Sequence, residues 1–348
     1  MKYRIGIWGQ YGAGGKIADG QAVRTTIITK ELQLRYGNSE VSVVNTNNWK
    51  RHPFGFLWNS VKLIYQSETV VIAPADNGFK VFVPLLIFFN IFFRRRLIYI
   101  VIGGFLPALL KRHPLYIKMV KRFDALFVQT KNIKKDLLEL GVEKVYILSN
   151  LKRITPRNKQ DIDRNEGKSF KLCTFSRVCK EKGIYDAVEA VNLANECLGK
   201  KIFTLDIYGL LPDVFKDKLQ TLLDENPEIL SYKGIVDYDK TVDVLKQYFA
   251  LLFPTYYHGE GFPGNVIDAY NSGLPIIATD WLYNKDIIKD GVNGILVQPH
   301  SPQQIKDAII NLYNNRELHR VISYNNIDES FKYSPTAVMA EFYSVIEK

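Results

Sequence analysis

The chain of 348 residues is poor in the side chains that build disulfides and zinc sites, with three cysteines and five histidines. Cys173, Cys179 and Cys197 are odd in number, and no two of them have C-x-x-C spacing. This scarcity argues against a disulfide framework and against a structural zinc site. We therefore expect a protein of the reducing cytoplasm.

Long uninterrupted apolar runs are also missing. Residues 81–93 are intensely apolar, but three arginines follow at once, and a spanning helix needs roughly 20 apolar residues. We favour a buried helix followed by a core strand. The alternative is a helix in the bilayer interface whose arginines meet lipid phosphates, which would make the protein peripheral on the inner face of an anionic cell membrane. The start of the chain enters a strand without a signal-peptide pattern.

Charge is distributed unevenly along the chain. Residues 1–160 hold 26 Lys+Arg against 9 Asp+Glu, a net charge of +17, whereas residues 161–348 hold 20 against 27, a net charge of −7. A basic first half suits nucleic acid, anionic lipid or a substrate that carries pyrophosphate, if it is more than ordinary solubility charge. The hydrophobic content of 47% indicates an ordered globular protein.

Short apolar segments alternate with helical patterns in both halves, which predicts parallel βαβ units. We expect strands near residues 4–8, 41–44, 69–72, 97–102, 125–128, 145–148, 170–175, 203–208, 229–233, 250–253, 275–278 and 294–297. The polar stretch 152–168 predicts a linker. The predicted fold class is thus α/β, with two doubly wound Rossmann-like domains, 1–151 and 169–333, facing a cleft.

The most informative segment runs from Glu260 to Asp268. A carboxylate precedes the Gly/Pro-rich turn Gly261-Phe-Pro-Gly264, the turn opens a short helix, and a second carboxylate lies eight residues after the first. Free N–H groups at a helix start can bind an anion, and carboxylates can accept sugar or ribose hydroxyls. The combination suits a nucleotide-sugar.

Two further loops follow predicted strands. Arg177 and Lys182 bracket a strand-to-helix turn, where they could hold a diphosphate from two sides. The loop from Gly9 to Lys16 contains Gly14 and Gly15, but its spacing is not G-x-G-x-x-G. Its glycines predict a close approach of the main chain to a ligand, unless the loop is only a tight turn.

Together, R-x4-K at 177–182 and E-x7-D at 260–268 resemble the family 4 retaining glycosyltransferases of GT-B architecture. Tyr208-Gly209, Phe253-Pro254-Thr255 and Asp290-Gly-Val-Asn-Gly294 are similar to the family pattern as well. The amino-acid sequence of residues 254–264 is similar to that of the branch of the family that builds bacterial capsular polysaccharides and exopolysaccharides. The resemblance is specific from about residue 173 to residue 297.

The resemblance implies a role for each matching residue. Arg177 and Lys182 would neutralise the donor diphosphate, Glu260 would contact the donor sugar, and the turn residues Gly261, Phe262, Pro263 and Gly264 would meet sugar hydroxyls and phosphate. Asp268 would hold the ribose hydroxyls, although the family usually has Glu there. A helix over 334–348 would return to the first domain.

Two features limit the assignment of catalytic groups. The stretch 99–105 lacks the histidine that many members of the family carry in the first domain, so we assign no catalytic base there. Asp237 and Asp239 have the spacing of a metal-binding D-x-D, but they precede a predicted helix, where Asp is a good cap. We expect no metal and no cofactor.

The sequence therefore predicts a metal-independent retaining glycosyltransferase. It would move a sugar from a nucleotide diphosphate donor, expected to be a UDP-sugar, to a glycan or polyprenyl-diphosphate-linked acceptor. A nucleotide-sugar 2-epimerase of the same architecture remains an alternative. We expect no nucleic acid as a partner, because no recognisable basic and aromatic binding module is present. An NAD-dependent oxidoreductase is disfavoured, because the second strand ends without a carboxylate for the ribose.

Overall fold

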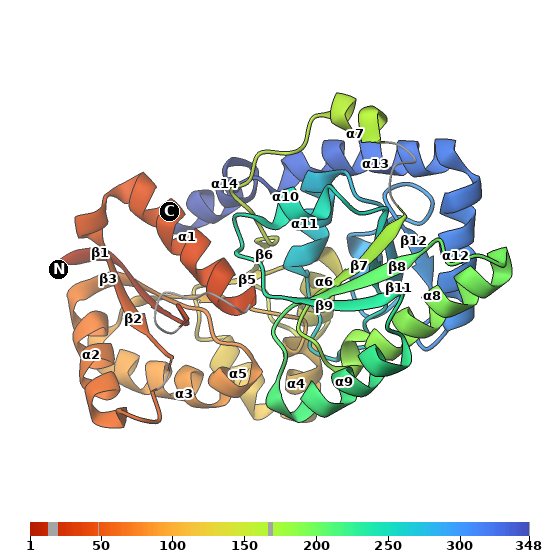
Figure 1. Ribbon diagram of the computed structural model, residues 1–348. Helices are drawn as coiled ribbons and strands as arrows, with labels where there is room; N and C mark the ends of the chain where they lie inside the picture. Colours follow the sequence, from red (N-terminus) through yellow and green to blue (C-terminus); the bar gives the residue numbers. More distant parts are fainter. Residues whose placement is uncertain (13–19, 48, 166–169, 348) are drawn as a thin grey trace. The chain divides into compact units, whose positions relative to one another are not determined.

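The computed structural model describes residues 1–12, 20–47, 49–165 and 170–347. The chain divides into two compact units, the first made of Met1–Leu151 and Pro335–Lys348, the second of Lys152–Ser334. Each unit is a parallel six-stranded sheet with helices on its faces (Figure 1). The α/β fold class with two Rossmann-like units is therefore confirmed.

The first unit has the strand order β2-β1-β3-β4-β5-β6, and every neighbouring pair is parallel. Its strands are β1 (Tyr3–Gly9), β2 (Val41–Asn45), β3 (Ser67–Ile72), β4 (Arg96–Ile100), β5 (Ala125–Val128) and β6 (Val145–Ile147). Its helices are α1 (Gly20–Tyr36), α2 (Pro53–Gln66), α3 (Asp76–Phe93), α4 (Leu106–Arg112), α5 (Leu115–Val120), α6 (Lys131–Glu139) and α14 (Pro335–Ile346).

The second unit has the order β12-β11-β10-β7-β8-β9, again entirely parallel. Its strands are β7 (Lys171–Phe175), β8 (Thr204–Tyr208), β9 (Leu230–Gly234), β10 (Ala250–Phe253), β11 (Ile276–Thr279) and β12 (Ile295–Val297). Its helices are α7 (Lys159–Asn165), α8 (Ile184–Leu198), α9 (Lys216–Glu225), α10 (Thr241–Leu245), α11 (Gly264–Ser272), α12 (Pro302–Asn314) and α13 (Arg316–Ser330).

Strand β10 shows why these sequences form parallel sheets. Ala250 and Leu252 pack into the core on one face of the sheet, while Leu251 and Phe253 pack into the core on the other. Since both faces are covered by helices, every residue of the strand is apolar and buried. All twelve strands lie where the apolar runs predict them.

The segment predicted as a linker belongs to the second unit. Within residues 152–165, α7 packs against α13, and Ile162 is 7% exposed. Lys152 is buried too, and its N–H donates to the Tyr333 carbonyl at 3.1 Å. The polar composition of this stretch therefore reflects a partly exposed helix rather than a free linker.

Helix α14 covers the sheet of the first unit although it comes from the end of the chain. Phe342 is fully buried, with its ring 4.7 Å from that of Phe127 on β5. Arg96 at the start of β4 donates to the carbonyls of Val345 and Ile346, at 2.6 and 2.8 Å. These cation contacts satisfy carbonyls at the end of α14 and fix that end against the sheet.

Helix α3 differs from the favoured expectation of a buried helix. It runs unbroken through Pro84, but only 22% of it is buried. Phe79 and Leu86 are fully buried against the unit, whereas Phe88 and Phe92 are mostly exposed. Among the described residues, α3 is the one helix long and apolar enough to cross a membrane by length and composition. The strand after it, β4, does lie in the core, as predicted.

Candidate functional site

The expected site residues gather where the chain changes direction across the second sheet. From β7 the chain builds β8 and β9 on one side, then crosses over to β10, β11 and β12 on the other. The point of reversal therefore lies between β7 and β10. Ligands of open α/β sheets bind outside the carboxyl ends of the strands at such a point. Lys182 follows β7, and Glu260 follows β10.

A buried ion pair joins these two loops. Lys182 Nζ lies 2.5 Å from Glu260 Oε2, and the two side chains are 10% and 9% exposed. The Thr255 hydroxyl donates to the same carboxylate oxygen at 2.9 Å. The Glu260 N–H donates to the Tyr257 carbonyl at 3.1 Å, which fixes the backbone beneath the carboxylate. Glu260 is thus held in one orientation by a cation, a hydroxyl and its own loop.

The backbones of the two loops approach closely enough to need glycine. The Tyr256 N–H donates to the Glu181 carbonyl at 2.8 Å. Gly183, the residue before α8, has φ 72°, and a Cβ there would meet the Pro254 carbonyl oxygen at 2.1 Å. Only a residue without a side chain fits both the conformation and the contact. Gly183 therefore permits the contact that brings Lys182 to Glu260.

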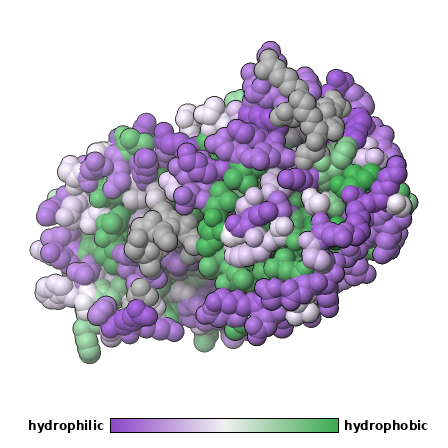
Figure 2. Space-filling model, viewed as in Figure 1, coloured by the Kyte–Doolittle hydropathy of each residue, from purple (hydrophilic) through white to green (hydrophobic). Residues whose placement is uncertain are grey.

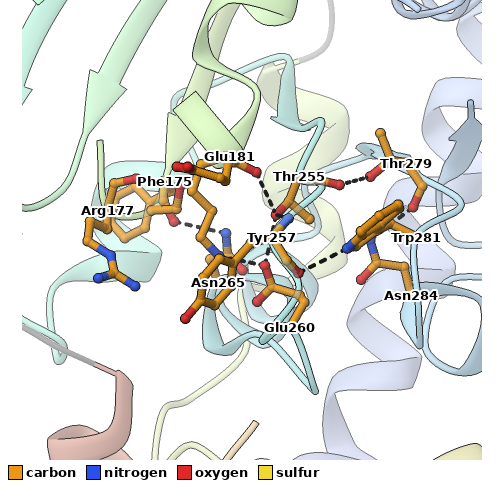
Figure 3. Close-up of polar contacts among 12 residues, drawn as sticks. Phe175, Arg177, Glu181, Thr255, Tyr257, Glu260, Asn265, Thr279, Trp281 and Asn284 are labelled. Atoms are coloured by element: carbon orange, nitrogen blue, oxygen red, sulfur yellow. Dashed lines mark hydrogen bonds and ion pairs between the residues drawn. The ribbon is translucent and has the colours of Figure 1, made fainter. Parts of the chain in front are cut away.

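Two further elements support the loop after β10 (Figure 3). The Thr279 hydroxyl at the end of β11 donates to the Thr255 carbonyl, and Trp281 Nε1 donates to the Tyr257 carbonyl at 2.9 Å. Asn265, in the first turn of α11, donates from Nδ2 to the Phe175 carbonyl at the end of β7, also at 2.9 Å. Backbone from three neighbouring strands is thus held around one carboxylate.

Aromatic faces line the cations. The Tyr257 ring centroid lies 5.1 Å from Lys182 Nζ and 5.7 Å from the Arg177 guanidinium carbon. Arg177 is exposed, and in Figure 3 its guanidinium lies apart from the Glu260 carboxylate. An exposed cation and a buried cation near one aromatic ring can together attract an anionic ligand.

The glycine-rich turn leads directly into α11. Pro263 is the residue before the helix, and no side chain caps the helix start. Gly261 and Phe262 are buried, and the Phe262 ring packs against Tyr333 with the centroids 4.9 Å apart. The backbone of this turn can therefore contribute to a ligand site, whereas the Phe262 side chain belongs to the core.

The structure places Asp268, the predicted ribose contact, in a buried ion pair. Its side chain is 3% exposed, and Lys152 Nζ lies 3.0 Å from its carboxylate. The Thr241 hydroxyl donates to Oδ1 at 2.8 Å. The reason is the position of α11, in which every residue from Asn265 to Ser272 is buried. The Asp268 carboxylate is thus paired inside the protein, as the Glu260 carboxylate is, and its contact with ribose stays a prediction.

The other predicted residues divide into two groups. Gly14 and Gly15 lie outside the described residues. Asp237 and Asp239 are exposed, and neither caps a helix, because α10 begins after Lys240 without a side-chain cap. The capping prediction was therefore wrong. No cluster of three or more potential metal-binding side chains was found in the described parts of the chain.

Sequence reasoning missed several groups that position the site. Thr255 stood in one of the motifs named above, and Thr279 directly follows the predicted strand 275–278, so their location near strand ends was a usable signal. Asn265 directly follows the glycine-rich turn, and this position was a weaker signal. Lys152 gave no signal, because it is 116 residues from Asp268 in the sequence.

Parallel Rossmann-like units with a Lys–Glu pair at the switch point of the second unit are features of a GT-B glycosyltransferase. The chain belongs to the family described as glycosyl transferases group 1, whose model matches residues 156–329. This match contains the β7–β12 sheet together with Arg177, Lys182, Glu260 and Asp268.

Comparisons with known proteins agree with this assignment. The chain is 26% identical over 226 residues to the uncharacterized glycosyltransferase MJ1069 of Methanocaldococcus jannaschii, covering 64% of this chain and 54% of that protein. It is 34% identical over 179 residues to the GtfA subunit of a Streptococcus pneumoniae UDP-N-acetylglucosamine–peptide N-acetylglucosaminyltransferase, covering 49% and 34%. The chain thus spans about half or less of the length of these relatives. The crystal structure of Anabaena HepE in complex with UDP superimposes with a TM-score of 0.76 at 15% identity, covering 99% of both chains, which shows the shared fold.

Proposed function

We propose that the protein is a retaining glycosyltransferase that moves a sugar from a UDP-sugar to a hydroxyl of a glycan acceptor. The observation that carries this proposal is the Lys182–Glu260 pair, which lies at the switch point between β7 and β10. The turn before the uncapped start of α11 follows Glu260 by a few residues. A cation, a carboxylate and backbone N–H groups match the phosphate and hydroxyl groups of a nucleotide-sugar.

In this proposal Lys182 and Arg177 hold the diphosphate and stabilise the negative charge that develops on the departing UDP. Glu260 accepts hydrogen bonds from the donor sugar, and the amides of residues 261–264 bind sugar hydroxyls and phosphate. The bond between the sugar and UDP breaks while the acceptor hydroxyl oxygen bonds to the sugar on the same face, and its proton passes to the departing phosphate oxygen of UDP. No step requires a metal, since the two cations and the helix start supply positive charge.

Two relatives support the identity of the donor. The pneumococcal GtfA subunit is named for a UDP-N-acetylglucosamine transferase, and HepE was crystallised with UDP. For the acceptor we propose a polyprenyl-diphosphate-linked glycan of a bacterial capsule or exopolysaccharide. The net charge of +17 over residues 1–160 supports an anionic acceptor on that side of the chain. Such an acceptor lies at the inner face of the cell membrane, so we propose that the protein is cytoplasmic and peripheral.

The donor proposal is tested by thermal shift with UDP, GDP, ADP and TDP, because a ligand that binds only the folded state raises apparent stability. We expect UDP to give the largest shift. A transfer assay with UDP-sugars then compares the wild type with Glu260→Ala and Arg177→Ala. Both variants should lose most activity, whereas Lys201→Ala, at an exposed ion pair of the same unit, should retain it. Transfer at the wild-type rate by both site variants would refute the site.

A further inference from the structure

The outer faces of α2 and α3 expose large apolar side chains in regular stripes. On α2, Phe54, Trp58 and Tyr65 are 86%, 71% and 62% exposed, and they follow one another at helical spacing. On α3, Phe88, Ile91 and Phe92 are 55%, 65% and 69% exposed. Isolated exposed apolar residues are ordinary, but six on two neighbouring helices form a patch that requires an explanation. We call these six residues the α2–α3 surface.

Contacts between the two helices show that they are neighbours, which brings the two stripes near one another. The Phe56 and Phe82 rings, on the inner sides of α2 and α3, lie 5.5 Å apart. Where the helices end, the Tyr65 ring meets the Phe93 ring edge-on at 5.9 Å. The Arg95 guanidinium donates to the carbonyls of Ile64 and Tyr65. The Arg95 backbone N–H donates to Asn90 Oδ1 at 2.6 Å. The two helix ends are therefore fastened together. In Figure 2, hydrophobic colour reaches the surface at the lower left, where Figure 1 places α2.

The charges around this surface are strongly one-sided. Residues 50–96 contain seven Lys+Arg and two Asp+Glu. Lys62 on α2 and Arg94 at the end of α3 are both exposed. In the sequence, Lys62 lies between Trp58 and Tyr65, and Arg94 follows Phe92 by two residues. Of the two acids, Asp76 already pairs with Lys80 at 3.4 Å. Aromatic and aliphatic side chains among basic ones are typical of a helix that lies in the interface of an anionic bilayer.

The inner face of α3 argues against a membrane-spanning role. Phe79, Val83 and Leu86 are fully buried, and the Phe79 ring packs 5.9 Å from that of Tyr99 in the sheet. Trp8 on β1 stacks with Phe56 and contacts Phe82. Pulling α3 into a bilayer would separate these packed side chains and expose the core of the unit. The helix can offer its outer face to lipid and keep its inner face in place.

We propose that the α2–α3 surface docks the protein onto an anionic lipid bilayer, with the six apolar side chains in the interface and the neighbouring cations at the lipid phosphates. This docking surface assigns the membrane contact of the proposed function to particular side chains. It rests on the proposed function only for its biological purpose. Binding to lipid can be measured without donor or acceptor. Its failure is therefore distinguishable from a failure of the transferase assignment, and UDP binding serves as the independent readout of the second unit.

The experiment is co-sedimentation with vesicles of phosphatidylcholine, with and without phosphatidylglycerol. The apolar variant combines Trp58→Ser, Phe88→Ser and Phe92→Ser, and the charge variant combines Lys62→Gln with Arg94→Asn, because Asn tolerates the left-handed backbone at that position. The matched control, Phe331→Ser, removes a 59% exposed aromatic residue from the second unit. Thermal unfolding and UDP binding verify that each variant is folded.

We expect the wild type and the control to bind anionic vesicles, and the apolar variant to lose binding by about tenfold or more. The charge variant should lose about fivefold per cation at low salt. Vesicles should shift the tryptophan emission of the wild type to the blue, and Trp58→Phe should abolish the shift while binding remains. The proposal is overturned if the wild type ignores anionic vesicles or if the apolar variant binds like the control. It is also overturned by resistance to alkaline carbonate, which indicates spanning, or by a stable dimer that the apolar variant dissociates.

Discussion

Replacing Lys152 with methionine should destabilise the second unit far more than removing an ordinary surface lysine. Lys152 and Asp268 are 7% and 3% exposed, with 3.0 Å between charged atoms. The Thr241 hydroxyl is the other partner of the carboxylate. Lys152→Met therefore leaves a buried carboxylate with one hydrogen bond and no counter-charge. Asp268→Asn leaves the buried Lys152 ammonium group without a counter-charge.

The size of the effect follows from burial. At 3.0 Å two unit charges attract by roughly 5–6 kcal/mol when the effective dielectric constant is about 20. Most of this attraction only offsets the cost of desolvating both ions, but removing one partner leaves that cost uncompensated. Such a loss amounts to about 3–5 kcal/mol. For a unit of this size, we expect an apparent melting temperature lower by about 6–20 °C.

The assay is a double-mutant cycle by thermal and urea unfolding, with Lys152→Met, Asp268→Asn and the double variant. The double variant should be clearly more stable than the sum of the single effects predicts, because it removes both charges together. Lys201→Met provides the matched control, since Lys201 and Glu228 form an ion pair in the same unit with both side chains 67% exposed. Its cost should stay below about 1 kcal/mol. Equal effects at positions 152 and 201 would refute the importance of the buried pair.

The same variants decide what Asp268 does. If its carboxylate serves only the protein, the folded double variant should bind UDP with an affinity within about twofold of the wild type. A carboxylate that accepts ribose hydroxyls would instead cost tenfold or more in affinity when replaced, about 1.4 kcal/mol or more. A tenfold loss in the double variant would restore the ribose role that the sequence pattern suggests.

Three other expectations can be checked quickly. Gly183→Ala should destabilise the protein and weaken UDP binding, because the new Cβ would lie 2.1 Å from the Pro254 oxygen. The control Gly199→Ala, at φ 61° with no atom within 4 Å of the new Cβ, should lower the free energy of unfolding by only about 1 kcal/mol. Burial lowers the pKa of His319, which stacks on Phe249, so the unfolded chain takes up the proton first as the pH falls below about 6.5. The melting temperature should therefore fall on acidification through that range, and less steeply in His319→Phe. Adding EDTA should leave the transfer rate unchanged; a rate that collapses and recovers with a divalent metal would contradict the metal-free proposal.

The strands were predictable because burial on both faces leaves a plain trace in the sequence. A strand such as Ala250–Phe253 has no polar position, and neighbouring elements do not alter that pattern. The surface of α3 was harder to predict. Apolar composition shows that a helix avoids water, but it does not show whether protein or lipid covers each face. Leu86 and Phe88 are both apolar in the sequence, and only the packing of the folded unit buries the first and exposes the second.

The site shows the same division between local and distant information. Lys182 and Glu260 each follow a strand, so parallel topology alone brings them to one edge of the sheet. Asp268 lies on a helix that is buried on every side, and its environment depends on Lys152, which is remote in sequence and within a stretch that resembles a linker. A spacing motif records which residues share an element but not which way a side chain turns. With a side chain one methylene shorter than Glu, and with Lys152 and Thr241 within reach, the carboxylate of Asp268 is satisfied inside the protein. Asp268→Glu introduces the longer side chain that the family usually has at this position. It should nevertheless strain the buried pair and lower the free energy of unfolding.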